Sequence, residues 1–258
     1  MTFDSLLFAR DGAVATITLN RPAAANGMDD VLTRELAEVA DTVADSDIKA
    51  VVLTGAGRFF CAGGDLKAMA ASPAGPGPFV AGIADNLHRA VATFARMDAV
   101  LIAAVNGVAA GAGFSLAVSA DLVLASEAAS FTMAYTKAGL SPDGSASYYL
   151  PRLVGPRRTV ELMLTNRTLS AAEAQEWGLV NEVVAGDVVA RAGELAAQIA
   201  TGARGSHAAV KKLVLASYGN NIETQMALEA ELISANADCS DGREGIEAFL
   251  GKRAPKFA

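Results

Sequence analysis

Cysteine, histidine and tryptophan are scarce in this chain of 258 residues, which contains two, two and one of them. Cys61 and Cys239 lie far apart and neither belongs to a C-x-x-C pair, which argues against a disulfide scaffold or a zinc site. The histidines, His88 and His207, are not spaced as metal ligands. We therefore expect a protein of the reducing cytoplasm without a metal or redox cofactor.

Basic charge is scarce as well, since the net charge is −7 and no dense basic tract is present; this argues against a nucleic-acid partner. The N-terminus carries Asp4 and Arg10 and does not resemble a signal peptide. The uncharged segment 99–120 is long enough to cross a bilayer. However, Asn106-Gly107 interrupts it and further glycines follow, so we predict strand, turn and buried helix here and no membrane partner.

Several nucleotide and hydrolase signatures are missing. There is no G-x-x-x-x-G-K-[ST] loop, which excludes a P-loop, and no G-x-S-x-G elbow, which disfavours a serine hydrolase. Gly111-Ala-Gly113 begins a G-x-G-x-x-G pattern, but Leu116 occupies its third position. No acidic residue follows at about 20 positions, where a ribose contact is expected. A nicotinamide site is therefore disfavoured.

Strands and helices alternate through most of the chain. Period-2 patterns and short apolar runs predict strands at 15–19, 49–54, 100–105, 122–125 and 131–133. Amphipathic spacing predicts helices at 29–43 and 80–97. The proline- and glycine-rich segment Ser72–Phe79 predicts an exposed loop and a candidate lid. This order of elements predicts an α/β fold.

Helices dominate from Ser170 onward. Ser170-Ala-Ala-Glu173 has the pattern of a capping box, and Trp177-Gly178 resembles a helix end. Helical apolar spacing then occurs at 186–202, 206–218 and 221–238. We predict an α/β core at residues 1–200 and a helical region at 201–258 that packs on its own core or on other subunits.

Two segments rich in small residues could present backbone N–H groups to a ligand. Phe59–Leu66 leads into a predicted helix, and Asn106–Gly113 follows a strand and opens another. The first amides of a helix lack partners within it, and small residues permit close approach. Two such donors aimed at one carbonyl oxygen form an oxyanion hole. The same glycines could serve helix packing alone, and the pattern leaves both interpretations open.

Asp143 is the most interesting polar group, because it lies in the turn-rich segment 139–144 between apolar runs. On the residues alone, a turn aspartate that binds its own backbone is the favoured interpretation. His88 fits a helix surface, while Cys61, Ser115 and Tyr135 fit packing positions.

Taken together, these segments resemble the enoyl-CoA hydratase/isomerase (crotonase) superfamily over nearly the whole chain. The matching stretches are FCAGGDL, NGVAAGAGFSLAVSADLVLAS, GLSPDGSASYYLPRLVG, SAAEAQEWGLVNEVV and DGREGIEAFLGKRAPKF. The resemblance implies a spiral of β-β-α turns whose helical C-terminal region, here 201–258, drives formation of trimers and often hexamers. It also implies an acyl-coenzyme A thioester as the substrate.

The resemblance assigns functional residues as well. It places oxyanion donors on the N–H groups of Gly64 and Ala112 and a catalytic carboxylate on Asp143. It implies substrate contacts at Ala62, Asp65, Leu66, Ser115, Tyr135, Phe249 and Lys252. Of these, Phe249 and Lys252 match positions that contact coenzyme A from a neighbouring subunit.

Departures from the family pattern favour isomerisation. Hydratases of the family carry glutamates at the positions of Ser115 and Tyr135, and neither residue can act as a carboxylate base. Asp143 falls where isomerases and aryl-CoA dehalogenases carry an aspartate, and AGAGFS, FTMAY and GLSPDG most resemble the ring-opening isomerases of phenylacetate degradation. We predict an acyl-CoA isomerase. The alternatives are a hydratase that uses other groups, a dehalogenase in which His88 activates water, and a non-catalytic acyl-CoA-binding paralogue.

Overall fold

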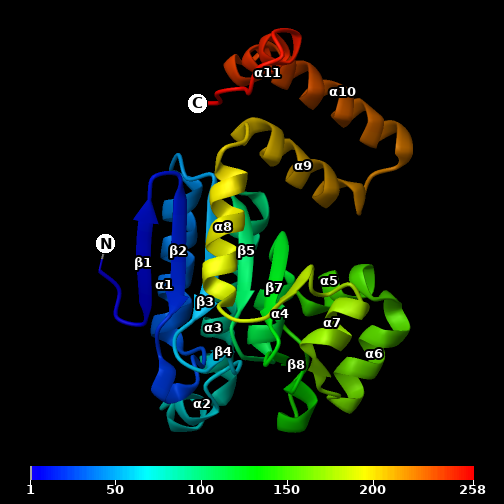
Figure 1. The fold of residues 1–258 in the computed structure, drawn as a ribbon. Coiled ribbons are helices and arrows are strands. Elements are labelled where there is room, and N and C mark those ends of the chain that lie inside the picture. Colours follow the sequence, from blue (N-terminus) through cyan, green and yellow to red (C-terminus); the bar gives the residue numbers. More distant parts are fainter. Residues whose placement is uncertain (1) are drawn as a thin grey trace.

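The computed structural model describes residues 2–258, and its core consists of two β-sheets surrounded by helices (Figure 1). The larger sheet has the strand order β1-β2-β3-β5-β7-β10, with β1 antiparallel to β2 and the other pairs parallel. The smaller sheet has the order β4-β6-β8-β9. The strands are Leu6–Asp11 (β1), Val14–Leu19 (β2), Ala50–Gly55 (β3), Phe59–Cys61 (β4), Val100–Val105 (β5), Val108–Ala110 (β6), Leu122–Ser126 (β7), Ser130–Thr132 (β8), Leu169–Ser170 (β9) and Glu182–Val184 (β10).

The chain passes alternately through the two sheets. Strand β3 leads to β4 and then to helices α2 (Leu66–Ala71) and α3 (Pro76–Arg96), and β5 leads to β6 and α4 (Ala112–Val118). Strand β7 leads in the same way to β8 and then to α5 (Ala146–Leu153). Parallel pairing stacks the repeated strands on one another in both sheets. The predicted α/β spiral of β-β-α turns is therefore confirmed.

Glycine is required where the chain passes from the larger sheet to the smaller one. A Cβ atom on Gly107, between β5 and β6, would lie 2.0 Å from the carbonyl oxygen of Arg58. Buried Asn26 closes the same corner, because its Nδ2 donates hydrogen bonds to the carbonyl oxygens of Ala56 and Phe59 at 3.0 and 2.8 Å. These contacts bring the two glycine-rich segments of the sequence together.

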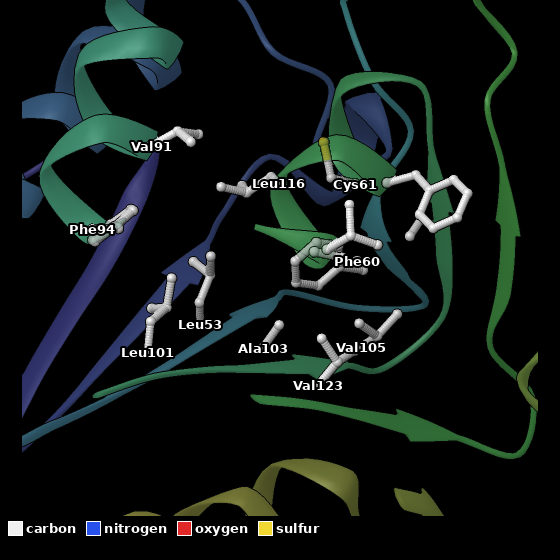
Figure 2. Packing of buried hydrophobic residues seen from close by; sticks show 14 of the residues in the cluster. Leu53, Phe60, Cys61, Val91, Phe94, Leu101, Ala103, Val105, Leu116 and Val123 are labelled. Atoms are coloured by element: carbon white, nitrogen blue, oxygen red, sulfur yellow. The ribbon is translucent and has the colours of Figure 1, made fainter. Parts of the chain in front are cut away.

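The central strands β3 and β5 of the larger sheet are buried on both faces, which explains why they are continuous apolar runs. Val51 and Leu53 of β3 face the main core beneath α1 (Asp30–Ala44) and α3, whereas Ala50 and Val52 face α8 (Val188–Ala200). Figure 2 shows Leu53, Leu101 and Val123 on neighbouring strands of the main core, together with Phe60, Phe94 and Leu116. Core residues therefore lie on both faces of these central strands.

The predicted capping box is present at α7 (Ala171–Glu176). Glu173 N donates to Ser170 Oγ at 3.2 Å, and Ser170 N donates to Glu173 Oε2 at 3.0 Å. Helix α6 (Gly155–Thr165) precedes it, and two short 3₁₀ segments lie at Pro22–Ala24 and Tyr135–Ala138.

Three C-terminal helices extend beyond the sheets, and Figure 1 shows them at one end of the molecule. They are α9 (Arg204–Ser217), α10 (Ile222–Asp238) and α11 (Ser240–Leu250), and neither α9 nor α10 contains a buried apolar residue. The expected helical C-terminal region is therefore present. Large apolar side chains are exposed along these helices, among them Val210, Ile222, Ile233, Phe249 and Leu250.

One sequence prediction is wrong in its second half. Residues 72–75 connect α2 to α3, but Pro76–Phe79 form the first turn of α3 rather than a loop. Proline suits this position, because the first helical N–H has no intrahelical partner and the fixed φ matches the helix. Across residues 2–258, no helix combines the length and the apolar character needed to cross a membrane.

Candidate active site

A cavity of about 300 Å³ lies where the two glycine-rich segments meet α3 and the segment that ends at Asp143. Ala62, Gly64 and Leu66 form one wall, and Gly111 and Ala112 form the adjacent one. Apolar side chains from α3 and the neighbouring loops complete the lining, namely Met28, Met69, Val80, Ile83, Leu87 and Leu140. Of the residues of 2–258 that line the cavity, Asp143 is the only carboxylate.

The N–H group of Gly64 is available to a ligand. Gly64 forms a parallel bridge with Met28, in which Met28 N donates to Gly63 O at 2.8 Å and Asp65 N donates to Met28 O at 2.9 Å. In such a bridge the central residue directs its own N–H to the opposite side. Gly64 N–H finds no acceptor within residues 2–258 and lies on the cavity wall.

Ala112 supplies a second N–H group. It is the first residue of α4, so its amide has no acceptor within the helix. A Cβ atom on Gly63 would lie 3.4 Å from Ala112 N, which shows how closely the two segments approach. Gly113 must also be glycine, since its Cβ would lie 2.2 Å from the Cys61 carbonyl oxygen. The glycine that the close packing requires therefore lies next to the amide that lacks an acceptor within the helix.

Asp143 also lines this cavity. It lies before α5, and its Oδ1 is 2.7 Å from Nε2 of His88 on α3. A carboxylate can only accept, so the imidazole nitrogen is the donor. This is more than a turn aspartate bonded to its own backbone, and the partner is 55 positions away.

Ser115 and Tyr135 form a polar link beside Asp143. The Tyr135 hydroxyl lies 3.1 Å from Ser115 Oγ and donates to the Asp143 carbonyl oxygen at 3.1 Å. Burial raises the pKa of Tyr135, and this increase outweighs the opposing effect of the Ser115 hydrogen bond. Tyr135 lines the cavity, whereas Ser115 is 0 % exposed and lies behind it.

Asp65 also lies outside the cavity lining. Its carboxylate accepts from the backbone N–H groups of Lys67 and Ala68 at 3.1 Å and pairs with Arg21 at 3.1 Å. Burial raises its pKa, but these hydrogen bonds and the Arg21 charge outweigh burial, so the pKa is lowered. Asp65 therefore caps α2 and fixes the segment that carries Gly64. The role of Arg21, which also pairs with Asp29 at 2.8 Å, was not foreseen from the sequence.

Cys61 is fully buried beneath this segment. Burial raises the pKa of its thiol to about 12, and a hydrogen bond from Gly63 N opposes this only in part. A thiol that stays protonated is a poor nucleophile, which agrees with a packing role.

Phe249 and Lys252 are not brought to the cavity of their own chain. Phe249 is 83 % exposed on α11 and lies with Ala203 and Phe257, among the C-terminal helices. Lys252 follows on the exposed end of the chain. The apolar residues of α3 that line the cavity were not identified from the sequence. Their helical spacing predicted a buried face but could not distinguish a cavity wall from core.

Comparison with known proteins gives the family. The model of the enoyl-CoA hydratase/isomerase family matches residues 9–258. The chain therefore belongs to this family.

Individual relatives differ in the activity that they are named for. The chain is 39% identical to 1,2-epoxyphenylacetyl-CoA isomerase of Escherichia coli, over 95% of this chain and 94% of that protein. It is 34% identical to 4-chlorobenzoyl coenzyme A dehalogenase-1 of an Arthrobacter species, over 93% and 88%. The structure of an enoyl-CoA hydratase from Polaromonas sp. JS666 is 34% identical and covers 98% of this chain and 99% of its own, with a TM-score of 0.93. The comparisons thus agree on an enzyme family that acts on coenzyme A thioesters and differ on the reaction.

Proposed function

We propose that this protein is an acyl-CoA isomerase that moves a double bond, or opens an activated ring, through a thioester enolate. The observation that carries the proposal is the composition of the cavity. Gly64 and Ala112 each offer an unpaired N–H group, and Asp143 is the one carboxylate among the lining residues of the described chain. One carboxylate with two amide donors suits proton transfer between carbons better than addition of water.

The chemistry needs one base and one place for negative charge. Asp143 takes a proton from a carbon next to the double bond, so that a C–H bond breaks and an O–H bond forms on the carboxylate. The electron pair moves onto the thioester oxygen, where the N–H groups of Gly64 and Ala112 stabilise it. Asp143 then returns the proton to a carbon two bonds away, and the thioester carbonyl reforms.

The neighbouring residues receive supporting roles in this proposal. Ala62 and Leu66 contact the coenzyme A portion, Tyr135 shapes the acyl pocket, and Ser115 acts through Tyr135. Residues 201–258 join copies of the chain into a trimer or hexamer, which would bring Phe249 and Lys252 of one copy to the substrate of another. We further propose a cytoplasmic enzyme, because both cysteines are unpaired.

The test is incubation of the purified protein with a 3-enoyl-CoA in heavy water, followed by mass spectrometry. We expect a 2-enoyl-CoA that carries deuterium and no added water. An epoxidised aryl-CoA is the second substrate, since the similarity to the named ring-opening isomerase supports it. A water adduct would instead support a hydratase.

Substitution of Asp143 separates catalysis from binding. Asp143→Asn removes the base and is expected to lower the rate by about 100- to 10,000-fold. Asp85→Asn, an exposed carboxylate on α3, is the matched control. If Asp143→Asn converts substrate at the wild-type rate, the mechanism is wrong. If the wild type binds coenzyme A and converts nothing, the protein is a non-catalytic paralogue.

The His88–Asp143 contact favours one second candidate, an aryl-CoA dehalogenase. In that reaction the aspartate attacks the ring carbon, halide leaves, and His88 activates water to release the phenol. Tyr135 replaces the tryptophan of the dehalogenase pattern and Gly64 replaces an aromatic residue, so we rank this candidate lower. Release of halide from a 4-halobenzoyl-CoA would establish it.

A further inference from the structure

Asp143 stands between two cavities. Besides the cavity of the candidate active site, a second one of about 530 Å³ lies between α3 and α5. Asp143 contributes to both, whereas His88 lines only the second. The side chain of His88 is about half exposed there. The histidine therefore reaches the carboxylate from outside the substrate pocket.

The two oxygens of the Asp143 carboxylate have different surroundings. Oδ1 accepts a hydrogen bond from His88 Nε2 at 2.7 Å, and Oδ2 accepts none from any group in residues 2–258. A charge-assisted contact of this length is among the stronger hydrogen bonds in proteins. It restrains rotation of the carboxyl group and leaves Oδ2 as the oxygen without a partner.

We propose that His88 is the positioning residue for Asp143, fixing Oδ1 so that Oδ2 acts as the base. The inference rests on the proposed acid/base role of Asp143. His88 does not line the substrate cavity, so it acts through the carboxylate and not through the acyl group. Misplacement of a reacting group by about 1 Å can lower a rate about 100-fold. The loss of His88 therefore affects turnover and leaves substrate binding nearly unchanged.

The backbone of Asp143 is held independently of His88. The Tyr135 hydroxyl donates to the Asp143 carbonyl oxygen at 3.1 Å. The next residue, Gly144, packs so closely that an added Cβ would lie 3.1 Å from both Leu87 Cδ2 and Ser115 Cβ. Removal of the exposed imidazole should therefore release the carboxyl group while the loop stays in place.

The experiment compares His88→Ala, His88→Gln and the control Ser147→Ala, an exposed residue of the same second cavity with no contact to Asp143. With a 3-enoyl-CoA, His88→Ala should lower kcat by about 10- to 100-fold and leave KM within about twofold, as expected of a residue outside the substrate cavity. His88→Gln, whose amide can still donate, should lose less. Free imidazole should enter the open second cavity and restore His88→Ala in a saturable manner, but not Asp143→Asn.

Two results would overturn the inference. One is a kcat for His88→Ala within twofold of the wild type. The other is a loss of kcat that accompanies a large fall in melting temperature and does not respond to imidazole, because this indicates a structural role.

A measurement without turnover separates this inference from the proposed function. The chain has two histidines, so the imidazole ¹⁵N signals are easily assigned with His88→Gln. Asp143→Ala should shift the Nε2 signal of His88, and Ser147→Ala should not. An unchanged signal overturns the inference even in an active isomerase. If no acyl-CoA is converted, the proposed function fails, and the signal still decides whether His88 holds Asp143.

Discussion

The Tyr135 hydroxyl donates a hydrogen bond to the backbone carbonyl oxygen of Asp143 at 3.1 Å. The same hydroxyl accepts a hydrogen bond from Ser115 Oγ at 3.1 Å, and the backbone N–H of Ser115 donates to Gly111 O at 3.0 Å. One short chain of polar groups therefore connects the residue before Ala112 to the residue that carries the carboxylate. This link fixes the position of the proposed oxyanion donor relative to the proposed base.

Tyr135→Phe should disturb the position of Asp143 relative to Ala112. Removal of the hydroxyl leaves Asp143 O without its donor, so we expect unfolding to become easier by about 1 kcal/mol and kcat to fall by about 10-fold. Urea unfolding and initial rates measure the two effects. Tyr149→Phe is the matched control, because Tyr149 is half-buried like Tyr135 and packs its ring edge-on against Tyr148. Equal effects of the two substitutions would contradict a specific role for Tyr135.

Ala112→Pro should remove one oxyanion donor without breaking α4. Ala112 is the first residue of that helix, where proline is tolerated because the N–H has no intrahelical partner. We expect kcat to fall by about 100- to 1000-fold, with a melting temperature near that of the wild type. Ala112→Gly keeps the N–H and separates the loss of the donor from the change of side chain. A rate for Ala112→Pro that matches Ala112→Gly would mean that the oxyanion is bound elsewhere.

Lys211 anchors the C-terminal helices to the core. Its side chain is 7 % exposed, pairs with Asp121 at 2.8 Å and donates to the carbonyl oxygens of Phe94 and Ala99 at 3.0 and 2.6 Å. Burial raises the pKa of Asp121, and the Lys211 charge opposes this. Lys211→Met leaves the partly exposed Asp121 carboxylate and two backbone carbonyl oxygens without this donor and should destabilise the fold by about 1–3 kcal/mol.

Denaturant unfolding and limited proteolysis measure this effect. Cleavage should increase near residues 200–220, where α9 meets the core. Lys212→Met, which changes the exposed neighbouring lysine, is the matched control. If Lys211→Met and Lys212→Met unfold alike, the anchor does not hold the helices.

Stability should fall as the pH rises above about 9, and Cys61 should be one cause. Burial raises the pKa of its thiol to about 12, whereas a thiol in an unfolded chain titrates near 8.5. The unfolded state therefore binds fewer protons than the folded state in this window. The free energy of unfolding then falls by up to about 1.4 kcal/mol per pH unit from this one group.

The pH series that tests this compares the wild type with Cys61→Ala between pH 8 and 10. Tyrosines contribute mainly at higher pH, so the slope in this range should be smaller in Cys61→Ala. Cys239→Ala, which changes an exposed thiol, should retain the wild-type slope. Identical slopes in all three proteins would exclude the buried thiol as the cause.

The elements of the fold were largely predictable from local patterns. Alternating residues at 15–19 and the apolar run at 100–105 became β2 and β5, and the Ser170–Glu173 capping box opened α7 as expected. The prediction failed at Pro76–Phe79, where proline begins a helix instead of ending one. Such composition is ambiguous, because proline suits both a turn and a first helical turn.

The contacts between the site residues depend on the tertiary structure. His88 and Asp143 are 55 positions apart and come together because α3 and the segment before α5 follow different turns of the spiral. The carboxylate of Asp65 is held by Arg21, 44 positions away, and Ser115 is withdrawn behind the cavity. No local pattern encodes these distances.

The sequence by itself determined the strands, the helices, the two glycine-rich segments and the resemblance to the family, because propensity, periodicity and capping act between residues near in the chain. Only the tertiary structure decided that Gly64 and Ala112 line one cavity, that Asp143 is its single carboxylate in the described chain, and that His88 Nε2 lies 2.7 Å from that carboxylate. These relations depend on strand register and on the close crossing at Gly107 and Gly113, where contacts between distant segments set the geometry.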